Sequence, residues 1–358
     1  MIAKIALNDR YSIYRHIPKN PIPNIVVVAF DNIAGGLRKK GFGIDFLFKN
    51  NIESFFVSHK SKSFFQGLSE SELNESLCKY LVGKKVFSYG ASLGGYAAIY
   101  YSRVLNSKPL AFSPRCSVDP IYNDAHDWGV AFHHRFLNEK LCWDLSPPLV
   151  VIDPYELRDK IFYDSRIFPA YQENIHLVEM PYVKHGTAEA MLAQGILKKF
   201  VLSYFLNEEL VVSNIDPWIN PYSLSEMALL SAKSKDFINA NKCLEKLVDL
   251  NVPRGCSRLR AYEILVRYGK LNHKFEKKLI VSSEKKHTHR VFFEKIKRSK
   301  SPQEFIFHNF NMQVWLMNYD LARELAVQSL EAYPAYTREH QLVEISERYL
   351  KNSEGLIF

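Results

Sequence analysis

Short apolar runs alternate with stretches of helical periodicity over roughly residues 24–206. The clearest run, Asn24-Ile-Val-Val-Val-Ala-Phe30, is continuous and β-branched, as in a strand that is buried on both faces. Residues 1–23 are predicted to form an edge hairpin or strand. Further strands are predicted at residues 52–57, 86–89, 109–112, 148–152 and 175–180. This alternation predicts an α/β fold with a mostly parallel sheet, helices on both faces, and ligands bound at the carboxyl ends of the strands.

Helices are predicted in the segments between these strands. Ser69-Glu-Ser-Glu72 has the pattern of a capping box, which predicts a helix from there to about Leu81. Other helices are predicted up to about Leu105, around residues 163–171, and from about Thr187 to Leu206. Residues 117–146 break this rhythm, because Asp, Asn, Trp, His and Phe crowd together there without periodicity. Their place in the chain predicts a lid-like insert over a functional site.

The pattern changes near Ser213, and beyond it the sequence contains no strong strand signal. Residues 224–250 and 310–349 resemble each other, with small residues where two helices would cross. That spacing resembles degenerate tetratricopeptide-type hairpins, and a generic helical bundle fits it equally well. We therefore expect an α/β catalytic domain over residues 1–212 and an α-helical domain over residues 213–358. Helical hairpins of this kind commonly bind a protein partner.

Composition and charge narrow the class of protein. The chain has 358 residues, enough for two domains, and its 47% apolar and 24% charged residues are ordinary for a soluble protein. We find no apolar run of membrane-spanning length and no signal peptide, which predicts a cytoplasmic location. The cysteines lack any C-x-x-C spacing, so neither a disulfide framework nor a zinc site is expected; they are Cys78, Cys116, Cys142, Cys243 and Cys256.

The formal net charge of +9 favours anionic partners. Many of the basic residues lie in a tract at 267–300, which is either a solvated helical face or an anion-binding surface. No recognised nucleic-acid motif accompanies this charge, so nucleic acid is an unlikely partner.

The strongest chemical signal is a serine between a predicted strand and a predicted helix. Gly90-Ala-Ser92-Leu-Gly94 has the G-x-S-x-G pattern of a nucleophile elbow. In such a turn the glycines allow strand and helix to approach closely, and the serine hydroxyl projects at the helix N-terminus. We predict Ser92 to be the nucleophile.

A serine nucleophile requires a base and an orienting carboxylate, in the chain order serine, acid, histidine. His185 follows the last predicted strand and is the candidate base. Two carboxylates follow the preceding strand, Asp153 at its end and Asp159 on what we expect to be a loop. We favour Asp159, and Asp153 remains the alternative because it could instead bond the backbone amides of the turn.

The remaining candidates concern the oxyanion and the substrate. The oxyanion hole is expected to use the backbone N–H of Leu93 together with that of Asp31 or Asn32. In the insert, the side chains that could contact substrate are those of His126, Trp128, His133 and His134. No ligand spacing indicates a metal, so we expect none.

With these residues the chain resembles the α/β-hydrolase superfamily over roughly residues 24–206. The resemblance rests on Gly90-Ala-Ser-Leu-Gly-Gly95 and on the later Asp and His185-Gly186 in the expected order. It is similar to the compact branch that includes esterases and bacterial capsule O-acetyltransferases. The resemblance implies an α/β-hydrolase-type sheet and the roles of nucleophile, base and acid for Ser92, His185, and Asp159 or Asp153. The chain departs from the superfamily at Phe30-Asp31, where a His-Gly signature is missing, and in its helical C-terminal half.

These observations lead to two hypotheses of different classes. The first is acyl-ester chemistry through an acyl-enzyme on Ser92, either as an esterase or deacetylase or as an O-acetyltransferase, with a carbohydrate or polysaccharide as substrate. Hydrolysis requires no cofactor, whereas acetyl transfer could use acetyl-CoA as donor. The alternative is a catalytically silent hydrolase-like scaffold that binds a partner through its helical half.

Overall fold

The computed structural model describes residues 1–134, 146–209, 216–248, 250, 319–332 and 343. The chain divides after Pro217 into two compact units, Met1–Pro217 and Trp218–Phe358. The first unit contains the sheet and all of the candidate site residues.

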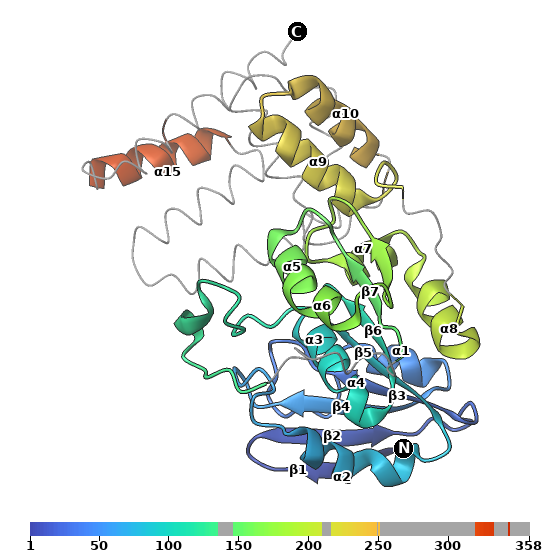
Figure 1. Cartoon of the computed structure of the whole chain (residues 1–358). Coiled ribbons are helices and arrows are strands. Elements are labelled where there is room, and N and C mark those ends of the chain that lie inside the picture. Colours follow the sequence, from blue (N-terminus) through green and yellow to red (C-terminus); the bar gives the residue numbers. More distant parts are fainter. Residues whose placement is uncertain (135–145, 210–215, 249, 251–318, 333–342, 344–358) are drawn as a thin grey trace. The chain divides into compact units, whose positions relative to one another are not determined.

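An eight-stranded sheet forms the centre of the first unit (Figure 1), with the strand order β1-β2-β4-β3-β5-β6-β7-β8. β2 pairs antiparallel with β1 and β4, and the other neighbouring pairs are parallel. This strand order is that of the α/β-hydrolase fold, which confirms the fold class. The strands are β1 (Ile2–Leu7), β2 (Tyr11–His16), β3 (Ile25–Phe30), β4 (Glu53–His59), β5 (Lys85–Ala91), β6 (Lys108–Phe112), β7 (Leu149–Ile152) and β8 (His176–Glu179).

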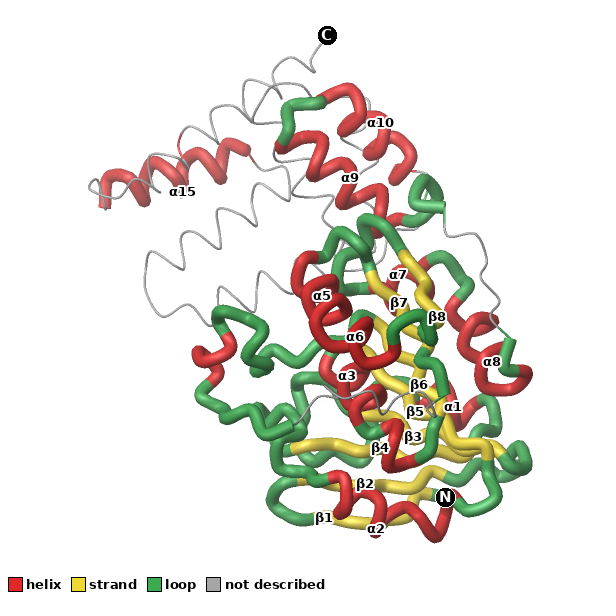
Figure 2. The backbone as a smooth tube through the Cα atoms, viewed as in Figure 1, coloured by secondary structure: helices red, strands yellow, loops and turns green. Residues whose placement is uncertain are grey.

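Helices cover both faces of this sheet (Figure 2). Val26, Val28 and Phe30 of β3 belong to one apolar cluster with residues of α2, α3 and α5. On the opposite face, the Tyr89 ring contacts Phe205 of α8 and lies against Gly43 at the start of α1. The helices are α1 (Ile44–Lys49), α2 (Glu70–Leu81), α3 (Leu93–Tyr100), α4 (Ser102–Leu105), α5 (Leu157–Phe162), α6 (Phe168–Tyr171), α7 (Thr187–Ala193) and α8 (Leu197–Asn207).

Local sequence signals predicted most of these elements well. The capping box is present, since the Ser69 hydroxyl accepts from the Glu72 N–H and the Glu72 carboxylate accepts from the Ser69 N–H. The edge hairpin predicted for the first 23 residues is confirmed as β1 and β2. The six-residue helix α1 was not predicted, because its Gly-rich surroundings show no helical periodicity.

Two helical predictions need correction. The helix expected at 163–171 begins earlier, at Leu157, and continues through a π-helical turn at Tyr163–Ile167 into α6. Asp159 therefore lies in the first turn of α5, not on a loop. The helix expected from Thr187 to Leu206 is two helices, because Gly195 adopts a positive φ of 77° between α7 and α8.

The predicted insert is described only in part. Residues 117–134 form loops with a single 3-10 turn, Ala125–Trp128, and residues 135–145 lie outside the described part of the chain. No described helix is both long enough and apolar enough to cross a membrane.

The described part of the second unit is helical. α9 (Pro221–Lys233) begins at an N-cap, where the Asn220 side chain accepts from the Tyr222 and Ser223 N–H groups. A short turn leads to α10 (Phe237–Val248), and α15 (Tyr319–Ala332) follows later in the chain. The basic tract at 267–300 and most of the repeat at 310–349 lie outside the described residues. The tetratricopeptide-like organisation stays a prediction.

Candidate active site

Ser92 occupies a strained turn between β5 and α3. Its backbone has φ 57° and ψ −123°, a conformation that only a sharp, well-supported turn maintains. A Cβ on Gly90 would lie 2.2 Å from the backbone carbon and oxygen of Gly94, and one on Gly94 would lie 2.5 Å from the Phe30 carbonyl oxygen. Both positions must therefore be glycine, and the close approach presents Ser92 at the carboxyl edge of the sheet.

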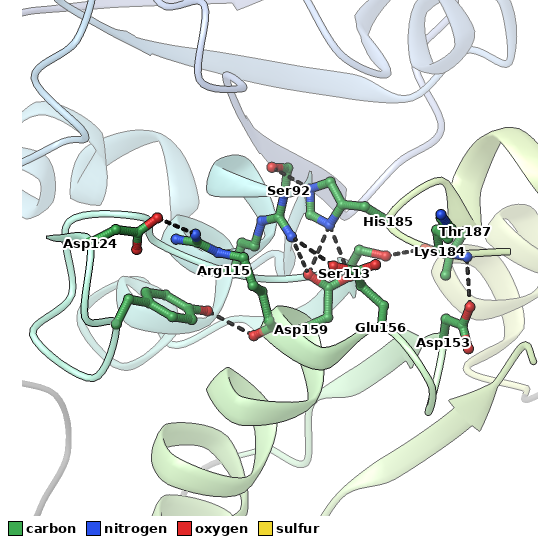
Figure 3. A network of polar contacts seen from close by, with 12 residues as sticks. Ser92, Ser113, Arg115, Asp124, Asp153, Glu156, Asp159, Lys184, His185 and Thr187 are labelled. Carbon is green, nitrogen blue, oxygen red and sulfur yellow. Dashed lines mark hydrogen bonds and ion pairs between the residues drawn. The ribbon is translucent and has the colours of Figure 1, made fainter. Parts of the chain in front are cut away.

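His185 lies on the loop between β8 and α7, and its imidazole faces Ser92 (Figure 3). The His185 Nε2 is 2.8 Å from the Ser92 Oγ. The loop is held by the Asp153 carboxylate, which accepts from the Lys184 N–H at 2.6 Å. This bond holds the backbone of the residue that precedes His185.

Asp159 completes a triad of side chains. Its two carboxylate oxygens lie 2.8 and 2.9 Å from the His185 Nδ1, and its side chain is 0% exposed. Because an ionised carboxylate only accepts hydrogen bonds, the His185 Nδ1 carries the proton. The Nε2 of the neutral ring is then the acceptor for the Ser92 hydroxyl, which is the arrangement that a general base requires.

Asp153, the alternative acid, has a different environment. Its carboxylate accepts from the backbone N–H groups of Tyr155 and Lys184, and it supports the turns after β7 and β8. Burial raises the pKa of Asp153, and these backbone hydrogen bonds counteract part of the rise. His185 therefore contacts Asp159 and not Asp153. Asp153 instead bonds the backbone amides of the turns, which was the other role considered for it.

The oxyanion donors differ in availability. Leu93 is the first residue of α3, where a backbone N–H has no partner within the helix. The Asp31 N–H donates to the Val57 carbonyl at 3.0 Å, so it is occupied by pairing with β4. Among the described residues, the Asn32 N–H bonds to the side chain of the adjacent Asp31, at 2.8 Å, and not to a neighbouring strand. Of the two predicted partners for Leu93, Asn32 is therefore the better candidate.

The Asp31 carboxylate stabilises this corner of the site. It is buried, pairs with the Arg38 guanidinium, and accepts from the Ser58 hydroxyl at 2.7 Å. These contacts tie the segment after β3 to β4. The backbone that carries Asn32 is held in place by them.

The four insert residues lie in two different environments. Trp128 is 41% exposed and contacts the Phe64 ring edge-on, and His126 is exposed beside Asp127. His133 is also exposed, whereas His134 is buried. Within the described residues, no contact joins any of the four to the triad. Their role in substrate binding stays a prediction, and for His134 the packing indicates a structural role.

His134 anchors the described end of the insert. Its ring stacks on Tyr100 at 4.1 Å, its Nδ1 lies 2.6 Å from the Tyr96 hydroxyl, and its Nε2 lies 3.1 Å from the Phe65 carbonyl oxygen. Burial lowers the pKa of His134 from 6.5 to about 4. The ring is therefore neutral in the folded protein near neutral pH.

We expect this histidine to make the protein sensitive to acid. Because the folded pKa lies below the unfolded one, the stabilisation is complete above about pH 6.5 and is lost as the pH falls toward 4. At pH 5 the loss from His134 is about 2 kcal/mol. Urea unfolding at pH 7.5 and pH 5 should show a smaller acid loss in His134→Gln than in the wild type. The exposed control His176→Gln should match the wild type, and equal losses in all three proteins would contradict the expectation.

Arg115 is a site residue that the sequence reasoning missed. It lies on the loop after β6, where its N–H donates to the Ser92 carbonyl at 3.3 Å. Its guanidinium Nη1 lies 3.1 Å from the Asp159 carboxylate and 3.5 Å from that of Glu156 (Figure 3). The available signal was a basic residue just beyond the strand that neighbours the elbow strand.

Among the described residues, no cluster of three or more His, Cys, Asp or Glu side chains could hold a metal ion.

Comparisons with known proteins gave structural likenesses only. No family model matches the chain, and no curated protein matches it in sequence. A dienelactone hydrolase from Anabaena variabilis is 16% identical, with a TM-score of 0.39, and the match covers 59% of this chain and 97% of that one. A serine hydrolase without a lid from Xanthomonas campestris is 13% identical, with a TM-score of 0.35, over 57% of this chain and 91% of that one.

A third solved structure, the mouse alpha/beta hydrolase domain-containing protein 10, is 9% identical, with a TM-score of 0.30, over 51% of this chain and 86% of that one. The assignment of the fold rests on the strand order and the elbow of this chain.

Proposed function

We propose that the protein is a serine hydrolase that acts on acyl esters through a covalent acyl-enzyme. One observation carries the proposal: the Ser92 Oγ lies 2.8 Å from the His185 Nε2, and the opposite ring nitrogen lies 2.8 Å from the buried Asp159. These residues approach one another from three separate segments of the chain. The arrangement is that of a nucleophile, a general base and an orienting acid.

The reaction follows from this geometry. His185 Nε2 takes the hydroxyl proton as the Ser92 Oγ attacks the ester carbonyl carbon, and the carbonyl oxygen becomes an oxyanion. The Leu93 N–H, with Asn32 as the candidate second donor, stabilises that charge. The ester C–O bond then breaks, the leaving alcohol takes the proton from His185, and the acyl group remains on Ser92. A water molecule repeats these steps, which releases the acid and restores the serine.

The acyl acceptor decides the finer activity. With water as acceptor the protein is an esterase or deacetylase, and with a sugar hydroxyl as acceptor and acetyl-CoA as donor it is an O-acetyltransferase. We favour ester hydrolysis of an acylated carbohydrate. The exposed ring of Trp128 supports a sugar, because an indole face stacks well on the apolar face of a pyranose. The scaffold alternative is less favoured, since the nucleophile, base and acid are all present and within hydrogen-bonding distance.

A covalent trap tests this proposal directly. The full-length protein is incubated with an alkyl phosphonofluoridate, digested, and examined by peptide mass spectrometry. We expect one phosphonylated site, Ser92, with labelling slowed while excess p-nitrophenyl acetate is present as a competing substrate. Labelling at another residue, or none, would contradict the proposal. Incubation with p-nitrophenyl acetate or acetyl-CoA, with and without a polysaccharide, then separates hydrolysis from transfer by whether acetyl appears as free acetate or on the polymer.

A further inference from the structure

His185 alone does not balance the negative charge of Asp159, the buried acid of the triad. Asp159 is fully buried, and an isolated carboxylate in such a place is costly unless a positive group compensates for it. In the resting state His185 must be neutral to act as a base, so it offers a hydrogen bond and no charge. Among the described residues, the positive side chain that contacts Asp159 is that of Arg115, whose guanidinium lies 3.1 Å from the carboxylate.

Arg115 contacts both ends of the triad. Its backbone N–H donates to the Ser92 carbonyl, and its side chain contacts the acid. The Arg115 side chain is only 22% exposed, and its guanidinium also contacts Glu156, so two carboxylates already pair with it. A cation paired in this way is better suited to position the acid than to bind an anionic substrate.

We propose that Arg115 is a positioning residue of the triad, whose charge balances Asp159 and thereby keeps His185 neutral and able to accept the Ser92 proton. This inference rests on the proposed function. Without Arg115, the buried carboxylate would recover a counter-charge by favouring the imidazolium form of His185. An imidazolium has no lone pair with which to accept the serine proton.

Charged groups from several segments act on His185, and they determine whether a substitution moves the pH dependence of activity up or down. They are Asp159 in α5, Glu156 at its N-cap, Arg115 after β6, and Asp153 after β7, which acts through the backbone of Lys184. Glu156 competes for the Arg115 guanidinium at 3.5 Å. Its side chain makes no N-cap hydrogen bond, so its neutralisation leaves the helix cap unchanged. Removing Arg115 and removing the Glu156 charge should therefore have opposite effects.

The test is the pH dependence of kcat/KM for p-nitrophenyl acetate in the full-length protein. The acidic limb is the pH range over which kcat/KM rises as the pH increases. In Arg115→Met we expect this limb to move up by about one pH unit, so that kcat/KM falls about tenfold at low pH and much less at high pH. In Glu156→Gln we expect the limb to move down by about half a unit. In Arg115→Lys, which keeps the charge, the limb should lie close to that of the wild type.

Arg158→Met is the matched control. Arg158 immediately precedes Asp159, but its guanidinium pairs with Asp124 at 2.5 Å and lies over the Tyr122 ring; among the described residues it makes no hydrogen bond or ion pair with the Asp159 carboxylate. The acidic limb of Arg158→Met should coincide with that of the wild type. Should Arg115→Met fail to fold, Arg115→Gln, which also removes the charge, takes its place with the same expected rise of the limb.

The outcomes separate this inference from the proposed function. Loss of turnover in Ser92→Ala, together with an unmoved limb in Arg115→Met or in Glu156→Gln, would overturn the role of Arg115 alone. A loss of activity in Arg115→Met that is equal at every pH would also overturn it, since that is the result of simple distortion. Turnover that survives in Ser92→Ala would remove the proposed function and this inference with it.

Discussion

Replacing Ser92 with alanine is expected to lower kcat for ester hydrolysis by about 10⁴- to 10⁶-fold. The variant loses the nucleophilic oxygen, the Ser92 Oγ, which lies 2.8 Å from the His185 Nε2. His185→Ala should cost a similar factor, because the unassisted hydroxyl is a poor nucleophile. The measurement is steady-state hydrolysis of p-nitrophenyl acetate by purified proteins of equal thermal stability.

Residues that act as one unit give non-additive losses, which sharpens this experiment. The double variant of Ser92 and His185 should be little worse than either single variant. Ser113→Ala is the matched control, because the Ser113 hydroxyl contacts Thr187 at 2.9 Å and not the triad. It should keep activity within a few-fold of the wild type. A Ser92→Ala enzyme within tenfold of the wild type would show that the ester reacts elsewhere.

Gly90→Ala is expected to lower the free energy of unfolding by more than about 4 kcal/mol. The added Cβ would lie 2.2 Å from the Gly94 backbone and 2.7 Å from the Gly95 nitrogen, and backbone atoms on both sides leave no flexible side chain to give way. Relief requires β5 and α3 to separate, which would also displace Ser92. Urea or thermal denaturation of the purified variant measures the effect.

Gly67→Ala provides the comparison for that substitution. There the nearest atoms to a new Cβ are 3.4 to 3.7 Å away, and they belong to the flexible Arg10 side chain. We expect a change of less than about 1 kcal/mol. A Gly90→Ala protein as stable as Gly67→Ala would contradict the close approach of strand and helix at the elbow.

The sequence alone determined the elements of this protein wherever the signal is local. The continuous apolar run of β3, the capping box at Ser69 and the glycines around Ser92 are each contained within a few residues. The backbone requirements of a strand, a helix start or a tight turn act over that same range. The fold class followed from the order of such elements, and so did the choice of Ser92 and His185 as candidates.

Only the tertiary structure decided which side chains meet. The sequence left Asp153 and Asp159 as alternatives, because both follow the same strand, and the orientation of α5 is what directs Asp159 to His185. The occupied N–H of Asp31 depends in the same way on pairing between β3 and β4.

Arg115 was not predicted at all, although it contacts a carboxylate 44 positions away in the chain. These contacts join residues on different strands and helices, and side-chain direction there is set by packing of the whole sheet. Local propensity and periodicity contain no information about such packing, so the charge balance of the site emerges only once the chain has folded.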